Sequence, residues 1–244
     1  MLENKKVVIF DLDGTLIDSI DIWNQIDIEL VKRISGKDIT FDEIKHIRDY
    51  IMANTKDGED KYLKYFEALA KKYNSSLTPV EISKLNDNVA MDMLKNYIDY
   101  RKDAENLIKY LKDNNFILVI ATTSPKYMVD IYRNENINII NKANINEYFD
   151  CVYTKESVRN LKPNPEIYLK ILNDLKVNAE ECISLEDSIE GVKSSLNAGI
   201  DVIAIYDKYS DNNREEINEL SNYQYDSFTD LLKDIKIRGY HEKI

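Results

Sequence analysis

Strand-like and helix-like segments alternate from about residue 102 to residue 205, and this alternation constrains the fold more than any other feature of the sequence. Short apolar runs predict the strands, and segments with helical periodicity follow them. The predicted strands cover residues 116–121, 151–154, 182–185 and 202–205, and the predicted helices cover residues 104–113, 125–134, 165–175 and 188–198. Helical connections make successive strands parallel, so we expect an α/β fold with a mostly parallel sheet wrapped by helices.

Residues 19–98 have a different pattern, because their periodicity is almost entirely helical. The predicted helices cover residues 19–34, 41–54, 58–73 and 79–97. The apolar run Val7–Phe10 precedes this block and reads as a further strand of the later sheet. We therefore expect one domain from residues 1–18 and 99–244, interrupted by a helical domain of residues 19–98.

Composition narrows the classes of partner. The chain has 33 basic and 44 acidic residues, a formal charge of −11, which argues against a nucleic-acid partner. The negative charge does not exclude a small phosphorylated metabolite as a partner, because a bound metal and one lysine at the site can neutralise the charge of its phosphate. Two cysteines in strand-like segments do not suggest a disulfide framework, no stretch approaches the roughly 18 apolar residues of a membrane span, and no signal peptide is visible. We expect a cytoplasmic enzyme without a membrane partner, as a monomer or a dimer.

Two carboxylates stand directly after the first predicted strand. Asp11 and Asp13 follow Val7–Phe10, and Gly14 comes next, as a sharp backbone turn would require. Acids at the carboxyl end of a buried strand repel each other unless a cation or a proton relieves them. This pattern favours a divalent-metal site, whereas the simpler alternative is an Asp-Gly turn with a solvated helix cap.

The segment Asp-Leu-Asp-Gly-Thr-Leu-Ile-Asp-Ser, residues 11–19, resembles the first motif of the haloacid dehalogenase-like (HAD) superfamily of phosphohydrolases. The resemblance implies a Rossmann-like three-layer core with a mostly parallel sheet. In one subgroup of that superfamily a helical cap domain lies between the first and second motifs. Residues 19–98 have the place and the size of such a cap.

The second candidate motif follows the strand predicted over residues 116–121. Thr122 directly ends that strand, and the resemblance implies that its hydroxyl binds a phosphate oxygen. Thr123 and Ser124 are further candidates for phosphate binding in the same turn. Ser124 also has a simpler interpretation as a helix N-cap, with Pro125 at the first helical position.

The third candidate motif is Lys162-Pro163-Asn164-Pro165, followed by an acidic and then an aromatic position. A single lysine in a loop is usually a solvated charge, but two prolines stiffen this loop and direct Lys162. The segment resembles the third motif of the capped subgroup. The resemblance implies that Lys162 neutralises the nucleophile and the transferring phosphoryl group.

A second acidic pair, Glu186 and Asp187, follows the strand predicted over residues 182–185. Asp187 with Glu190 also resembles a helix capping box in outline, which is the structural alternative. The resemblance makes Asp187 a direct magnesium ligand and Glu186 a ligand or a support that acts through water. The resemblance extends to residues 226–232, which are similar to the family's last strand and helix, whereas residues 207–222 read as a surface loop with a weak helix.

These motifs together predict a Mg²⁺-dependent phosphatase that hydrolyses a small phosphomonoester through an aspartyl-phosphate. The predicted nucleophile is Asp11, the predicted acid–base is Asp13, and the predicted metal ligands are Asp11, the Asp13 carbonyl, Glu186 and Asp187. One alternative is a phosphosugar mutase of the β-phosphoglucomutase kind, which shares all four motifs. The other is a non-catalytic regulator on the same fold. The helical block reveals little about the substrate, although Arg48 and Lys56 are candidate contacts for a second anionic group.

Overall fold

The computed structural model describes residues 1–56 and 59–238, and the chain divides into two compact units. The first, which we call the sheet unit, comprises Met1–Ile20 and Ile98–Ile244, and the second, the helical unit, comprises Asp21–Tyr97. Within the described residues, the structure contains no helix that is long and apolar enough to cross a membrane.

The sheet unit contains a parallel sheet in the order β3-β2-β1-β4-β5-β6. Its strands are β1 (Val7–Phe10), β2 (Ile117–Ala121), β3 (Cys151–Tyr153), β4 (Cys182–Glu186), β5 (Asp201–Ile205) and β6 (Tyr223–Tyr225). The first strand is therefore central, and the chain order reverses on its two sides. Phe10 of β1 pairs with Ile120 of β2 and with Leu185 of β4, so these three strands end at the same level.

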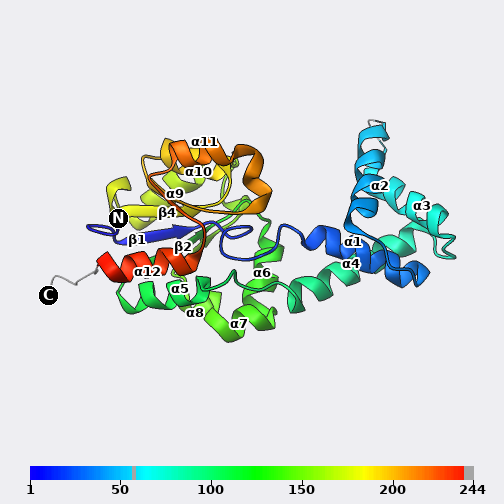
Figure 1. Ribbon diagram of the computed structural model, residues 1–244, viewed down its shortest axis with the longest axis horizontal. Coiled ribbons are helices and arrows are strands. Elements are labelled where there is room, and N and C mark those ends of the chain that lie inside the picture. The colour runs from blue at the N-terminus through cyan, green and yellow to red at the C-terminus, as the bar shows by residue number, and fades with distance from the viewer. Residues whose placement is uncertain (57–58, 239–244) are drawn as a thin grey trace. The chain divides into compact units, whose positions relative to one another are not determined.

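Helices cover both faces of the sheet. They are α5 (Ala104–Asp113), α6 (Lys126–Asn134), α7 (Ile137–Ala143), α8 (Ile145–Tyr148), α9 (Glu166–Leu175), α10 (Ile189–Asn197), α11 (Arg214–Leu220) and α12 (Phe228–Arg238). Short 3₁₀ turns span Lys155–Ser157, Ala179–Glu181 and Lys208–Asn213. Figure 1 shows α5 and α12 on one face and α9, α10 and α11 on the other. Val7 and Ile9 of β1 pack in one buried cluster with Ile167 and Ile171 of α9. The predicted α/β, Rossmann-like core with its parallel sheet is confirmed.

The helical unit consists of α1 (Ile22–Ser35), α2 (Phe41–Asn54), α3 (Lys61–Tyr73) and α4 (Pro79–Asn96). Its buried core contains Leu30, Val31, Ile44, Tyr65, Phe66, Leu69 and Ile82. Capping boxes of Thr40 with Glu43 and of Thr78 with Glu81 begin α2 and α4, because each pair satisfies backbone donors reciprocally. The predicted start of the third helix at Gly58 lies outside the described residues, and α3 begins at Lys61. A cap role for this unit stays a prediction.

Some element predictions are wrong. The helix predicted from residue 19 begins at Ile22. Helices α7 and α8 were not predicted, because their sequence is rich in asparagine, which has a low helix propensity. The last strand is β6 at Tyr223–Tyr225 and does not lie within residues 226–232, where α12 begins. Its three residues are partly or fully exposed, so no apolar run marks it.

Candidate active site

Three adjacent strands bring the predicted motifs to one edge of the sheet. Asp11 follows β1, Thr122 follows β2, and Glu186 and Asp187 lie at the end of β4. The Asp11 amide donates a hydrogen bond to the carbonyl of Leu185 (3.0 Å), which continues the ladder one residue beyond β1. Because the strands are parallel and end together, their terminal side chains converge at the carboxyl edge, where α/β proteins bind ligands.

A tight turn after Asp13 closes one side of this edge. Gly14 has a φ of +84°, which favours glycine, and its amide donates to the carbonyl of Ile17 at 3.0 Å. A Cβ at Gly14 would lie 2.7 Å from Oδ2 of Asp187. The chain therefore passes so close to Asp187 that a side chain at residue 14 does not fit.

Three buried carboxylates form a cluster at this edge. One oxygen from each of Asp11, Glu186 and Asp187 lies within 4.8 Å of the others. Burial raises the pKa of Asp11 well above its ordinary value; Lys162 opposes this, while Glu186 and Asp187 add to it. Burial likewise raises the pKa of Asp187 to about 7, although the Thr15 hydroxyl donates to Asp187 Oδ1 at 2.6 Å. Ionisation of the cluster is thus costly unless a cation is present.

Lys162 is the cation that the structure places in the cluster. Its Nζ donates to Oδ1 of Asp11 at 2.7 Å, to Oε1 of Glu186 at 2.6 Å and to the carbonyl of Ala121 at 2.8 Å. Burial alone would lower the pKa of Lys162, but the carboxylates of Asp11 and Glu186 raise it above its ordinary value. The Ser194 hydroxyl donates to the carbonyl of Asn164 at 2.7 Å and so anchors the loop that carries Lys162.

The charges and atoms of the cluster fit a divalent cation. One ammonium group against three ionised carboxylates leaves two negative charges to be neutralised. Oε2 of Glu186 is buried and has no hydrogen-bond partner among the described residues. Carboxylate oxygens are the ligands that Mg²⁺ and Ca²⁺ prefer, so the residues present could hold a hard divalent metal.

Asp13 has surroundings unlike those of the cluster, because hydroxyl groups bind its carboxylate. Ser19 Oγ donates to Oδ1 at 2.6 Å, and Ser124 Oγ donates to Oδ2 at 2.5 Å. The hydroxyl of Thr122 lies 3.5 Å from Oδ2. The half-buried Asp13 side chain is therefore oriented by neutral donors, and the predicted ligand role of its backbone carbonyl stays a prediction.

The N-cap interpretation of Ser124 is wrong. Helix α6 begins at Lys126 with Pro125 at the N-cap position and without a side-chain cap. The Ser124 hydroxyl donates to Asp13 instead, and the Ser124 amide donates to Oγ1 of Thr122 at 3.0 Å. Thr122 is buried at the site, whereas Thr123 is exposed.

The capping-box interpretation of Asp187 is also wrong. Ser188 is the N-cap of α10, and its hydroxyl accepts a hydrogen bond from the Gly191 amide at 3.1 Å. Asp187 is therefore not needed to cap the helix, and it stays in the buried cluster.

Several residues contact the site without having been singled out in the sequence. The hydroxyl of Tyr168 donates to Oε1 of Glu186, and Thr15 donates to Asp187. Arg101 donates to the carbonyls of Gly14 and Tyr206 and so joins two loops at the edge of the sheet. Thr15 lies within the first motif and Tyr168 is the aromatic position of the third, but no sequence pattern shows which partners Tyr168 or Arg101 contacts.

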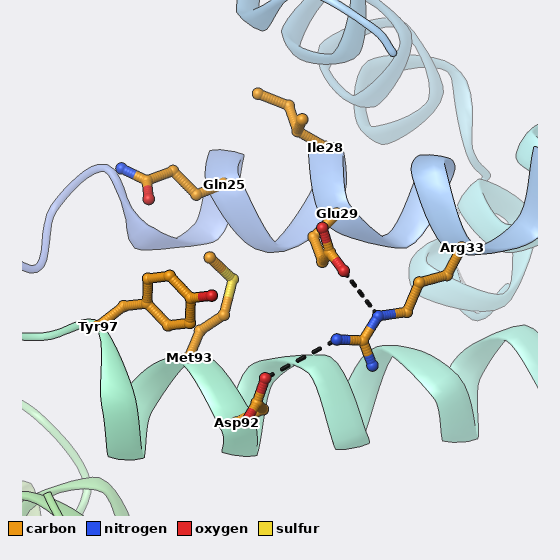
Figure 2. A pocket seen from close by; sticks show the side chains of 7 residues that line it. All are labelled: Gln25, Ile28, Glu29, Arg33, Asp92, Met93 and Tyr97. Carbon is orange, nitrogen blue, oxygen red and sulfur yellow. Dashed lines mark hydrogen bonds and ion pairs between the residues drawn. The ribbon is translucent and has the colours of Figure 1, made fainter. Parts of the chain in front are cut away.

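The helical unit has polar features of its own. Arg48 donates to Oδ2 of Asp27 at 2.6 Å and also to the side chain of Asn24, while Lys56 is exposed. A separate groove of about 250 Å³ lies between α1 and α4. Figure 2 shows that Arg33 pairs with Glu29 and Asp92 in this groove. Gln25, Ile28, Met93 and Tyr97 complete its lining. None of the predicted site residues lines this groove.

Comparisons with known proteins bear on the family and the fold of this chain. The family model described as haloacid dehalogenase-like hydrolase matches residues 8–205. A phosphorylated carbohydrates phosphatase of Thermotoga maritima is 28% identical over 201 residues, which cover 81% of this chain and 83% of that protein. A phosphoglycolate phosphatase of Colwellia psychrerythraea is 26% identical over 96% of this chain and 99% of that protein. The crystal structure of a putative β-phosphoglucomutase from Thermotoga maritima shares the fold, with a TM-score of 0.71 at 20% identity, over 94% of this chain and 99% of that one.

Proposed function

This chain belongs to the haloacid dehalogenase-like hydrolase family, and from that premise we propose that it is a magnesium-dependent phosphatase acting on a small phosphomonoester. Its relatives are named phosphatases, which makes the chain a phosphohydrolase. The observation that carries the finer proposal is the position of Asp11. Its carboxylate lies at the centre of the carboxyl edge, bonded to Lys162 and next to two further acids.

Asp11 acts as the nucleophile in this proposal. One of its carboxylate oxygens attacks phosphorus, the new O–P bond forms, and the bond from phosphorus to the leaving alkoxide breaks. Asp13 gives its proton to that alkoxide. Asp13 then takes a proton from the water that attacks the aspartyl-phosphate, which releases phosphate and restores Asp11. The hydroxyls of Ser19 and Ser124 support this role because they orient the Asp13 carboxylate.

Two further groups contact the phosphoryl oxygens. Lys162 supplies a permanent positive charge beside Asp11, and Thr122 supplies a hydroxyl from the end of β2. Asp11, Glu186, Asp187 and the Asp13 carbonyl would hold Mg²⁺, which when bound neutralises the cluster and the charge on the phosphoryl group. Thr123 and Ser124 complete the proposed phosphate-binding turn.

We assign substrate selection to the helical unit, as a cap, because the sheet unit contains the groups for the chemistry. The relatives are named for phosphorylated carbohydrates and for phosphoglycolate, so a small phosphorylated metabolite is the proposed substrate class. The free thiols of Cys151 and Cys182 suit a cytoplasmic location. A monomer or a dimer stays the predicted assembly.

A phosphosugar mutase is the second candidate, and the structural similarity to a putative β-phosphoglucomutase favours it. Both reactions would proceed through a phosphorylated Asp11. A requirement for a bisphosphorylated sugar activator, together with the absence of phosphate release, would identify the mutase.

The proposal is tested by the variant Asp11→Asn with Mg²⁺ and a panel of phosphomonoesters. We expect phosphate release and covalent phosphate labelling to fall about a thousandfold or more, since the nucleophile is lost. Asp18→Asn is the matched control, because Asp18 is an exposed acid in the same segment. Activity of Asp11→Asn close to that of the control would refute the proposed mechanism.

A further inference from the structure

Tyr168 connects two of the proposed site residues although it lies on a helix of the core. It belongs to the first turn of α9 and is completely buried. Its hydroxyl donates a hydrogen bond to Oε1 of Glu186, and the Lys162 ammonium lies 5.5 Å from the centre of its ring. A single side chain therefore contacts both the acid and the cation of the cluster.

The two oxygens of Glu186 are used unequally. Oε1 accepts hydrogen bonds from both Lys162 and Tyr168. Oε2 accepts none from any described residue and is buried. It lies against the first turn of α10, where a Cβ at Gly191 would be 1.8 Å away. The Glu186 carboxylate therefore accepts two hydrogen bonds at Oε1 and none from the described residues at Oε2.

This asymmetry depends on the tyrosine hydroxyl. The last torsion of a glutamate side chain is broad and nearly two-fold, so one donor alone restrains the carboxylate plane weakly. A second donor at the same oxygen fixes which oxygen stays free. Hydrogen bonds to a charged carboxylate are also about twice as strong as neutral ones. A phenylalanine at residue 168 would fill the core equally well but would leave Glu186 with Lys162 alone.

We propose that Tyr168 is a positioning residue, which holds Oε1 of Glu186 beside Lys162 and so keeps Oε2 available to the divalent cation or to a water bound to it. The inference rests on the proposed function only for the identity of that cation. Groups that orient metal ligands typically affect metal affinity and activity by about tenfold or more.

The test compares Tyr168→Phe with Tyr153→Phe. Tyr153 is a close match, because it is a buried tyrosine whose hydroxyl donates to Asp174 at 3.0 Å and whose ring lies 6.0 Å from the Lys170 ammonium. We expect Tyr168→Phe to weaken Mg²⁺ binding, measured by calorimetric titration, about tenfold, and Tyr153→Phe to leave it within about twofold. We also expect kcat for a phosphomonoester to fall in Tyr168→Phe, with KM unchanged.

A double-mutant cycle separates positioning from general packing. Tyr168 acts through Glu186, so Tyr168→Phe should not weaken Mg²⁺ binding further in a Glu186→Gln background. Equal Mg²⁺ affinity of Tyr168→Phe and the wild type, or full additivity with Glu186→Gln, overturns the inference. If the wild type binds Mg²⁺ but releases phosphate from no phosphomonoester, the proposed function fails while the affinity measurements still decide the role of Tyr168.

Discussion

Replacing Asp187 with asparagine should stabilise the metal-free protein and at the same time remove its response to magnesium. Burial raises the pKa of Asp187 to about 7, from an ordinary value of 3.8. That difference corresponds to about 4 kcal/mol of free energy of unfolding lost once the group is ionised in both states. Asparagine keeps an oxygen to accept the hydrogen bond from Thr15, so the loss of the charge is the main change.

The sign of the pH dependence follows from the raised pKa. The folded state binds the proton of Asp187 more tightly than the unfolded state, so stability falls as pH rises from about 4 to about 7. Below that window the carboxyl is protonated in both states and costs nothing. Above it the full penalty is present. Asp187→Asn should therefore gain stability at pH 8 and gain much less at pH 5.

Urea unfolding with a chelator present measures this directly. We expect Asp187→Asn to exceed the wild type by up to about 4 kcal/mol at pH 8. Mg²⁺ should stabilise the wild type but not the variant. Glu190→Gln is the matched control, because it removes an exposed acid three residues along, on α10. If Asp187→Asn is no more stable than the wild type at pH 8, the reasoning from burial is wrong.

Two further substitutions test buried contacts, one in the sheet unit and one in the helical unit. Gly191→Ala should destabilise the protein by about 1–3 kcal/mol and weaken Mg²⁺ binding, since its Cβ would lie 1.8 Å from Oε2 of Glu186. A higher melting temperature, the usual result of this change within a helix, would contradict that contact. Arg48→Leu should cost about 2 kcal/mol in urea unfolding at pH 8, because it leaves Asp27 buried and unpaired. Burial already raises the pKa of Asp27, so the cost should shrink as pH falls toward 4, and Arg33→Leu, which breaks exposed ion pairs, should cost less than about 1 kcal/mol.

Four of the five strands that the sequence predicted, β1, β2, β4 and β5, lie inside the sheet and are buried almost throughout. The fifth, β3, is an edge strand whose first two residues are half-buried. Val7–Phe10 is completely buried, and four consecutive apolar residues there reflect helices on both sides of the sheet. The strand β6 lies at the opposite edge from β3 and alternates half-buried and exposed residues, so its stability comes from pairing with β5 rather than from an apolar run. Such a strand forms only by pairing with a strand that is distant in the sequence, so no local sequence pattern predicts it.

The convergence of the acidic residues could be expected for a similar reason. Parallel strands that end in register bring the residues that follow them to one edge of the sheet. A correct prediction that β1 and β4 are parallel neighbours is therefore enough to predict that Asp11 and Asp187 lie close together. The contact of Tyr168 with Glu186 is different in kind. It depends on the length of a side chain and on the packing of α9 against the sheet, and an aromatic residue at that position reads equally well as core.

At two turns the sequence left open whether a serine hydroxyl caps the following helix or contacts the site, and the structure shows opposite outcomes at the two turns. Ser124 and Ser188 each lie between a strand end and a helix, and either hydroxyl is suited to an N-cap. Ser188 caps α10, which leaves Asp187 to the acidic cluster. Ser124 does not cap α6, because Pro125 takes that position and the hydroxyl bonds to Asp13. Asp187 is available to the site because its neighbour Ser188 caps the helix. Ser124 is available because α6 begins later, at Lys126, with Pro125 at the N-cap position. These two outcomes depend on backbone torsions at single residues, which is why the motif predicts the chemistry of the turn more readily than the partner of each side chain.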